Sequence, residues 1–316
     1  MSHRTVSTRR KIFVTGISGC VGHYLFDRLL DENRYHLHLL VRDPRRLRFD
    51  LRRRDRVEVI VDGLEHIERH GDLLQEMDAV VHLAARWGGP NTFVVNLERT
   101  LSLFSHLDPR RCRRVIYFST ASILDADNRP DANVERHGGE YLRSKYRCLL
   151  ALEDLAIHAR VVTLFPTVIL GGDDTHPPAH ASREIEKAWK YLRLIRFLTV
   201  DGSFHFIHAH DLAAMAAHIL DAADPPRAMV AGQPAVTVDD CLTELCRIAG
   251  LKRRRRFDAS FLVDTLIPRI GGGRLSAWDR YALRKKHFTH RVTRPETLGL
   301  HSAFPALSDC LAPPGG

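Results

Sequence analysis

Residues 11–22, which read KIFVTGISGCVG, decide the fold. The apolar run 11–15 predicts a short strand, and the TGxxGxxG pattern predicts a tight turn into a helix over 21–30. In such a turn the first glycine permits the bend, the second lets the backbone approach a pyrophosphate, and the third lets the helix pack against the sheet. The free N–H groups at the start of the helix favour phosphate. The stretch therefore predicts a dinucleotide-binding turn with contacts from Gly16, Ser18, Gly19, Cys20 and Val21.

Outward from this turn, short β-branched runs alternate with helical stretches. We predict strands at 36–41, 57–61, 79–83, 114–119 and 160–165, and helices at 96–107 and 140–156. This rhythm predicts an α/β fold with a doubly wound parallel sheet of the Rossmann type. After Gly171 it loosens into a loop over 172–181, a strand near 228–230, and helices over 183–193, 211–220 and 237–249. We expect a nucleotide-binding core over 1–170 and a smaller, mainly substrate-binding region over 171–316, of which 199–222 returns to the core.

The end of the second predicted strand indicates which dinucleotide is bound. An acidic residue there holds the ribose 2′-hydroxyl of NAD, whereas an arginine accommodates the 2′-phosphate of NADP. Arg42 occupies the expected position, with Arg45 and Arg46 close behind. Asp43 leaves NAD open, since a shift of one residue would bring its carboxylate to the ribose. The three positive charges favour NADP, with Arg42 as the contact.

Further motifs follow along the chain in a fixed order. They read VVHLAA (80–85), Asn96, FSTAS (118–122), YLRSK (141–145), FPTVILG (165–171), FIHAHDLA (206–213), TLGL (297–300) and FP (304–305). With the glycine turn, this order resembles the extended short-chain dehydrogenase/reductases of the NAD-dependent epimerase/dehydratase superfamily. The segments VRDP (41–44) and PT (166–167) resemble the branch that contains dihydroflavonol reductases and 3β-hydroxysteroid dehydrogenases. The resemblance implies further cofactor contacts at Asp62, Leu83, Ala84, Ala85, Pro166 and Val168.

The resemblance also implies catalytic roles for Thr120, Tyr141 and Lys145. Tyr141 and Lys145 are spaced i, i+4, which puts them on one helix face. A tyrosine pKa near 10 is too high for free proton exchange at neutral pH, and a nearby ammonium lowers it. Tyr141 would then exchange a proton with the reacting oxygen, Lys145 would also hold the nicotinamide ribose, and Thr120 would hydrogen-bond the oxygen. Ser119 and Ser122 are neighbours, but the offset of Thr120 from the strand end matches the family position.

Three functions remain open at this point. The favoured one is an NADP-dependent oxidoreductase that interconverts a carbonyl and an alcohol in a small-molecule substrate. A nucleotide-sugar epimerase or dehydratase with retained NAD(P) is disfavoured by Arg42, and Ala121-Ser122 stands where sugar dehydratases carry an Asp-Glu pair. A non-catalytic NADP-binding regulatory or assembly protein is disfavoured because the Tyr/Lys pair is retained. The motifs select neither the substrate nor the direction of the reaction.

Charge and composition limit the partners. The 316 residues carry a formal net charge of +9, and arginine is concentrated in residues 42–56 and 252–256. No nucleic-acid-binding motif accompanies these runs, so they predict a solvated face or a site for an anionic cofactor rather than nucleic-acid binding. Peripheral membrane contact through them has no other support. No apolar run reaches the ~20 residues of a membrane span, and no signal-peptide core follows Met1, so we expect a cytoplasmic protein.

The cysteines and histidines predict no metal. None of the six cysteines forms a CxxC pair. His205, His208 and His210 are expected to form a structural strand-to-helix corner, with Asp211 capping the helix. Relatives in the resembled family commonly dimerise through a four-helix bundle. The equivalent helices here would cover 97–107 and 142–155, which predicts a homodimer.

Overall fold

The computed structural model describes residues 9–31, 34–49, 55–254, 257–259 and 285–311. Its centre is a seven-stranded sheet with the order β11-β6-β5-β4-β1-β2-β3, in which every neighbouring pair is parallel. The strands are β1 (Arg10–Thr15), β2 (Tyr35–Val41), β3 (Val57–Val61), β4 (Ala79–His82), β5 (Arg114–Phe118), β6 (Val161–Pro166) and β11 (Ala228–Ala231). The chain leaves β1 in one direction to β2 and β3, and then returns to β4 on the other side. The carboxyl ends of β1 and β4 therefore form a topological switch point, where such sheets bind ligands.

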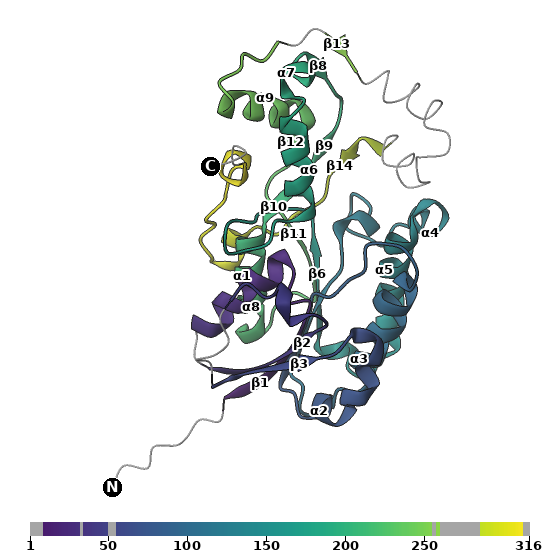
Figure 1. Ribbon diagram of the computed structural model, residues 1–316. Helices are drawn as coiled ribbons and strands as arrows, with labels where there is room; N and C mark the ends of the chain where they lie inside the picture. The colour runs from purple at the N-terminus through teal and green to yellow at the C-terminus, as the bar shows by residue number, and fades with distance from the viewer. Residues whose placement is uncertain (1–8, 32–33, 50–54, 255–256, 260–284, 312–316) are drawn as a thin grey trace.

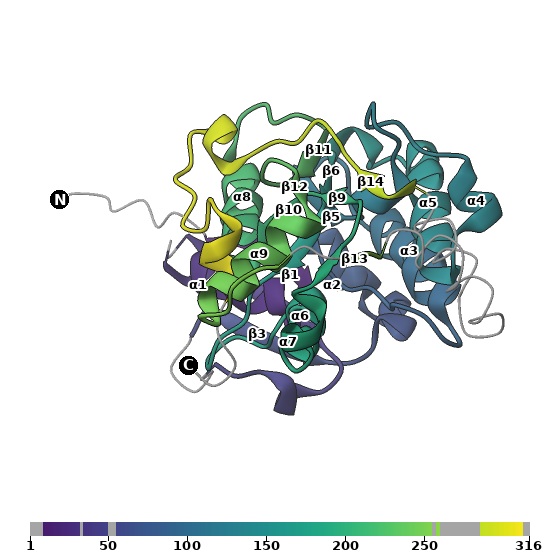
Figure 2. The same ribbon diagram turned by 90° about the horizontal axis from the view of Figure 1, so that it is seen from above.

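Helices cover both faces of the sheet (Figures 1 and 2). One layer contains α1 (Cys20–Asp31) and α8 (Ala209–Asp221), and the other contains α2 (Gly71–Gln75), α3 (Arg99–Ser105) and α5 (Glu140–Ala151). Alternate strand residues serve the two layers: Val14 belongs to the cluster with α1 and α8, and Phe13 to the cluster with α3 and α5. The predicted doubly wound α/β fold is confirmed. Among the described residues, every helix is too short or too polar to cross a membrane.

The remaining elements, except α4, gather at the top of Figure 1. They are α4 (Asn133–His137), β7 (Val168–Leu170), α6 (His180–Trp189), α7 (Leu192–Ile195), β8 (Leu198–Thr199), β9 (Ser203–Phe204), β10 (Phe206–His208), β12 (Val236–Thr237), α9 (Val238–Ile248), β13 (Phe257–Asp258) and β14 (His287–Phe288). β7 pairs with β10, β13 with β8, and β9 with both β12 and β14. The predicted division at residue 170 stays a prediction. Two later elements, α8 and β11, lie with the central sheet and its helical layer.

Several predicted helix boundaries are wrong. The helix predicted over 140–156 ends at Ala151, because two 3₁₀ turns follow and bring Leu152 and Ile157 into the core. The helix predicted over 183–193 begins at His180 and ends at Trp189. The helix predicted over 96–107 starts as a π-turn at Val94–Glu98 and continues as α3. The arginine-rich runs 42–56 and 252–256 lie partly outside the described residues.

Asp211 does not cap its helix as predicted. His208 is the N-cap of α8, and its side chain accepts a hydrogen bond from the backbone N–H of His210. Asp211 lies one turn further in and is 1% exposed. Its carboxylate accepts hydrogen bonds from the Ser302 hydroxyl and from the backbone N–H groups of Ala303 and Phe304. It therefore ties the C-terminal segment to the α1/α8 layer.

Candidate active site

A cavity of about 1380 Å³ lies along the carboxyl edge of the sheet. Its wall begins where the strands end, at Gly16 after β1, Arg42 after β2, Asp62 after β3, Leu83 after β4 and Thr120 after β5. Every residue predicted from the sequence as a catalytic or cofactor contact lines it: Gly16, Ser18, Gly19, Cys20, Val21, Arg42, Asp62, Leu83, Ala84, Ala85, Thr120, Tyr141, Lys145, Pro166 and Val168. The strand order brings together residues that are distant in sequence.

The glycine turn has the shape that a pyrophosphate requires. Gly16 has φ +78°, and a Cβ added there would lie 2.5 Å from the Ala84 backbone nitrogen. A Cβ at Gly22 would lie 2.5 Å from the Gly16 and Ile17 carbonyl oxygens. Gly16 therefore allows β1 and β4 to approach, and Gly22 lets α1 start against the turn. The Gly19 N–H donates to the Gly16 carbonyl at 3.0 Å and closes the turn, and Gly19, Cys20 and Val21 at the beginning of α1 line the cavity wall.

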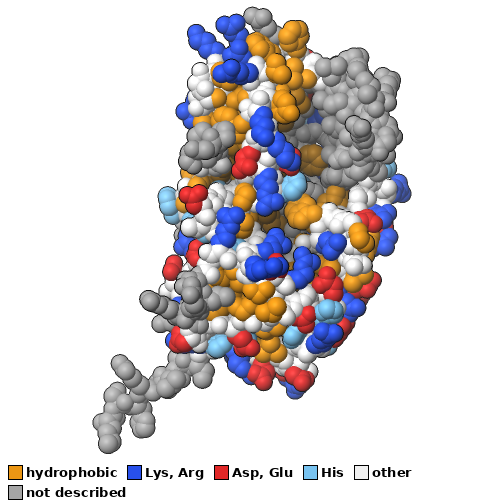
Figure 3. All heavy atoms as spheres, viewed as in Figure 1, with side chains coloured by type: hydrophobic (Ala, Val, Ile, Leu, Met, Phe, Trp, Pro, Cys, Tyr) orange, Lys and Arg blue, Asp and Glu red, His pale blue; other side chains and the backbone are white. Residues whose placement is uncertain are grey.

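The end of β2 presents cations to the same cavity. Asp43 accepts a hydrogen bond from Arg45 Nε at 2.9 Å and caps the short 3₁₀ turn Pro44–Arg46, and this contact lowers the pKa of Asp43. Arg42 and Arg46 line the cavity and form no ion pair with any described residue. Figure 3 shows Lys and Arg side chains gathered across the middle of one face of the molecule. The charge left for a ligand at the end of β2 is therefore positive.

Asp62 is held by its own turn. Its carboxylate contacts His66 Nδ1 at 2.7 Å, His70 Nε2 at 3.1 Å and the Gly63 backbone N–H at 2.7 Å. These contacts, the one with His66 foremost, lower the pKa of Asp62 to about 2. The residue lies in the cavity wall as an ionised carboxylate that is already bonded to its neighbours.

Tyr141 and Thr120 meet in the wall of the cavity. Burial raises the pKa of Tyr141, and a hydrogen bond from Thr120 acts in the opposite direction. The raised pKa contradicts the sequence-based expectation that Lys145 lowers it. Lys145 is fully buried, and its Nζ donates to the Phe118 carbonyl oxygen at 2.7 Å while lying 4.7 Å from the centre of the Tyr117 ring. Burial lowers the pKa of Lys145 to about 8.

Trp87 is a cavity residue that sequence reasoning missed. Its ring stacks on Tyr141 at 4.5 Å with an interplanar angle of 16°, and near His180 at 5.6 Å and 14°. The ring is 66% exposed, so stacking rather than burial positions it. The signal in the sequence is its place two residues after the predicted contact Ala85, since the chain there follows the cavity wall.

Asn96 fixes the base of the Trp87 loop. Its amide accepts from the Arg86 backbone N–H at 2.8 Å and donates to the Arg86 carbonyl at 2.8 Å. It also donates to Ser144 Oγ at 3.0 Å, and this hydroxyl donates to the Tyr141 carbonyl at 2.7 Å. Asn96 is fully buried, so the hydrogen bonds lock the loop to α5. The sequence placed Asn96 among the ordered motifs but did not predict this role.

Further cavity residues missed from the sequence come from later segments. They include His180, Arg183, Phe204, His205, Phe288 and His290. His205 Nδ1 contacts the Gln233 carbonyl at 2.8 Å, and its Nε2 accepts from the His290 backbone N–H at 3.0 Å. Both ring nitrogens are thus used by backbone groups. Within the described part of the chain, no grouping of metal ligands falls in this cavity.

Comparisons with known proteins agree with this geometry. The sequence model of the NAD dependent epimerase/dehydratase family matches residues 12–232. The crystal structure of gox2253 aligns with a TM-score of 0.70 at 21% identity, covering 96% of this chain and 97% of that chain. The terminal R domain from the myxalamid PKS-NRPS biosynthetic pathway has a TM-score of 0.68 at 15% identity, with 88% and 79% coverage.

A dTDP-glucose 4,6-dehydratase from Bacillus anthracis, solved in complex with NAD, has a TM-score of 0.66 at 10% identity, with 95% and 94% coverage. These structural likenesses show the fold alone at such identities. A comparison with curated protein sequences gives no match.

Proposed function

Because the chain belongs to the NAD dependent epimerase/dehydratase family, whose extended short-chain dehydrogenase/reductase members are NAD(P)-dependent oxidoreductases, we propose that it interconverts a carbonyl and an alcohol with NADP. The observation that carries this proposal is the contact between Thr120 and Tyr141 in the wall of the cavity that also contains the glycine turn. Two hydroxyls at one point of a dinucleotide-sized cavity can bind and protonate one substrate oxygen. The membership in the dihydroflavonol reductase and 3β-hydroxysteroid dehydrogenase branch stays a prediction.

The residues present fit a bound dinucleotide. Gly16, Gly19 and the start of α1 would hold the pyrophosphate, and Arg42 with Arg46 would hold a 2′-phosphate. The carboxylate of Asp43 already accepts a hydrogen bond from Arg45 and is therefore less available to a ribose 2′-hydroxyl, which supports NADP over NAD. The nicotinamide supplies or accepts a hydride when bound. Lys145 would hold its ribose, as in the resembled family.

Tyr141 would act as the proton donor to the carbonyl oxygen. Burial keeps its pKa high, so the phenol carries its proton at neutral pH and is ready for carbonyl reduction. The hydrogen bond from Thr120 stabilises the phenolate that remains after transfer. Trp87 covers one face of the Tyr141 ring and limits the access of water to the phenol.

The competing functions keep specific support. The dehydratase from Bacillus anthracis shares the fold and was solved with NAD, which favours a nucleotide-sugar epimerase or dehydratase. Against it stand Arg42 and Arg46 at the end of β2, and Ala121-Ser122 after Thr120. A non-catalytic cofactor-binding protein would have no need of the Thr120–Tyr141 contact.

Substitution of Tyr141 tests the proposal. Tyr141→Phe should lower turnover by about 10²–10⁴-fold with a panel of aldehydes and ketones, since it removes only the acid–base group. Binding of NADPH should persist because the ring remains. Tyr146→Phe, five residues along the same helix and outside the cavity lining, is the matched control. Stopped-flow hydride transfer by Tyr141→Phe at the wild-type rate would reject Tyr141 as the proton donor, whereas binding of NADPH by the wild type without turnover of any carbonyl in the panel would favour the binding protein.

Homodimerisation also stays a proposal. The helices expected at the interface correspond to α3 and α5, and Leu150 on α5 is exposed. Leu97 and Leu101 instead pack partly against the core of their own chain. The apolar surface that these helices offer to a partner is therefore small.

A further inference from the structure

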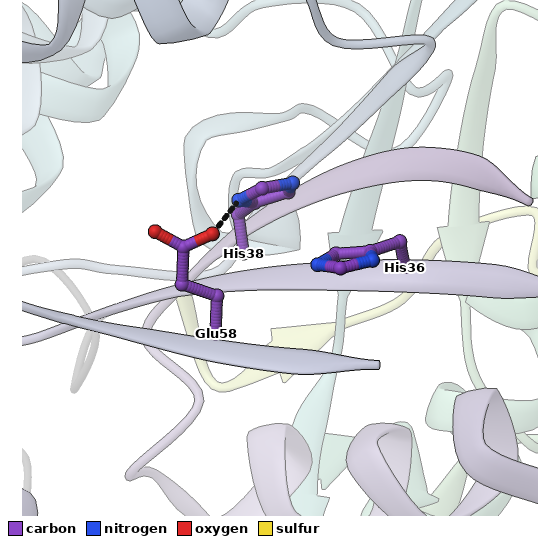
Figure 4. Close-up of side chains that lie close together, drawn as sticks. All are labelled: His36, His38 and Glu58. Carbon is purple, nitrogen blue, oxygen red and sulfur yellow. Dashed lines mark ion pairs between the residues drawn. The ribbon is translucent and has the colours of Figure 1, made fainter. Parts of the chain in front are cut away.

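Two histidines and a glutamate converge on the sheet away from the cavity. His36 and His38 are two residues apart on β2, so their side chains point to the same face. Glu58 on β3 is the register partner of His38. Figure 4 shows the three side chains on neighbouring strands, with the Glu58 carboxylate against the His38 ring.

The three side chains bring their donor atoms near to one another. His38 Nδ1 lies 3.1 Å from Glu58 Oε2, and one donor atom from each of the three residues lies within 4.8 Å of the other two. The two imidazole rings are 4.9 Å apart at an interplanar angle of 28°. Two ligands bound to one tetrahedral zinc ion lie about 3.3 Å apart, given bonds of about 2.0–2.1 Å.

His38 is an anomaly unless it has another partner. It is 5% exposed, and neither of its ring nitrogens makes a hydrogen bond of acceptable geometry with the described residues. Buried polar groups in folded proteins are almost always satisfied, since an unpaired one is costly. The contact with Glu58 is close but is not directed along a hydrogen bond.

We propose that His36, His38 and Glu58 bind a divalent transition-metal ion, with Zn²⁺ as the preferred ion. Two imidazole nitrogens and one carboxylate oxygen form a donor set that suits Zn²⁺, whereas Mg²⁺ and Ca²⁺ prefer oxygen ligands alone. The fourth position is left to water. Binding would require the three donor atoms, now within 4.8 Å of one another, to move closer together.

The surroundings accept a cation. Lys11 is the register partner of His36 on β1, but its ammonium is paired with Glu76 at 2.5 Å.

Zinc titration of chelator-dialysed protein tests the site by calorimetry. Wild-type protein should bind one Zn²⁺ at a site that weakens by at least about tenfold in His36→Ala and in Glu58→Gln. Both side chains are partly or largely exposed, so these variants should fold. His218→Ala, an exposed histidine on α8, is the control and should leave the titration unchanged.

Cobalt supplies a second readout that does not depend on other weak sites. Co²⁺ at the proposed site should give the intense visible d–d absorption of tetrahedral coordination, and His36→Ala should abolish it. Identical zinc isotherms in wild type, His36→Ala and Glu58→Gln would overturn the proposal. So would a weak octahedral cobalt spectrum that His36→Ala leaves unchanged. Both measurements use cofactor-free protein, so neither depends on the proposed oxidoreductase activity.

Discussion

Two parts of the molecule are built in different ways. The nucleotide-binding half is the seven-stranded sheet with its two helical layers, and the distal region contains α6, α7, α9, β8, β9, β12, β13 and β14. In the first, strands of up to seven residues lie between two helical layers, and two extended clusters bury their side chains. In the distal region, β8, β9, β12, β13 and β14 have two residues each, and a small cluster around Leu192 and Leu245 forms the core. A long strand specifies its own face through alternation, whereas a two-residue strand is positioned by the partner that it meets.

This contrast agrees with the expectation that one part binds the cofactor and the other binds the substrate. The cofactor is the same for every member of a dinucleotide-binding class, so its half can be rigid and specified by local motifs. The distal region supplies Phe204, His205, Phe288 and His290 to the same cavity from two separate segments. Its elements depend on long-range pairing, such as that of β9 with β14. That this region selects the substrate stays a prediction.

A pair of matched substitutions tests whether the two regions unfold independently. Leu29→Ala removes a fully buried side chain from the first cluster and should lower the free energy of unfolding by about 3–5 kcal/mol. Leu245→Ala, which is 2% exposed, should cost less and act mainly on the distal region. Urea unfolding with hydrogen exchange separates the two effects. If Leu245→Ala destabilises the central sheet as much as Leu29→Ala does, the two regions are a single cooperative unit.

The buried Lys145 should make the stability of the nucleotide-binding half depend on pH. Its folded-state pKa of about 8 lies below the ordinary 10.5, so the folded state binds fewer protons and stability rises as pH increases between these values. The shift corresponds to about 3 kcal/mol. Wild type relative to Lys145→Met should gain stability of this order between pH 8 and 10.5 in urea titrations. Lys187→Met, in the exposed part of α6, is the control and should show no such difference. A pH-independent difference between wild type and Lys145→Met would mean that the ammonium is solvated.

Cofactor preference should depend on one local side chain. Arg42→Ala should weaken NADPH binding by about tenfold and leave NADH binding almost unchanged, because only the 2′-phosphate loses a charge-assisted contact. Fluorescence titration of both cofactors measures this. Arg110→Ala is the control, since Arg110 is exposed and lies outside the cavity lining. Equal affinity of the wild type for the two cofactors would contradict the NADP preference.

The sequence predicted the nucleotide-binding half better than the distal region for physical reasons. The glycine turn requires particular residues at fixed positions, so Gly16, Gly19 and Gly22 could be identified one by one. The central strands are long enough for their apolar runs to be recognised. The two-residue strands β9 and β12 carry no periodicity, and the sequence showed neither.

The site was predicted in its composition but not in its electrostatics. Every residue expected in the cavity lines it, because each follows a strand end or belongs to a motif. The spacing of Tyr141 and Lys145 placed them on one helix but could not show that Lys145 Nζ bonds to the Phe118 carbonyl. Ring stacking such as that of Trp87 on Tyr141 also depends on the fold of a loop. Contacts of this kind follow from tertiary packing and leave no pattern in the sequence.

Trp87 is one of the contacts between the two regions, since its ring lies against Tyr141 of α5 and near His180 of α6. Trp87→Ala should cost at most about 1 kcal/mol in the free energy of unfolding, because an aromatic stack contributes about 0.5–1.5 kcal/mol and this ring is mostly exposed. The main effect should be on the pKa of Tyr141 rather than on stability. Removal of the ring hydrates the phenol and should lower this pKa towards its ordinary value of 10.0. Ultraviolet titration of the tyrosinate, with Tyr141→Phe as the subtraction, measures that pKa, and Trp87→Phe should preserve the wild-type value. An unchanged Tyr141 pKa in Trp87→Ala would mean that the nucleotide-binding half alone buries the phenol.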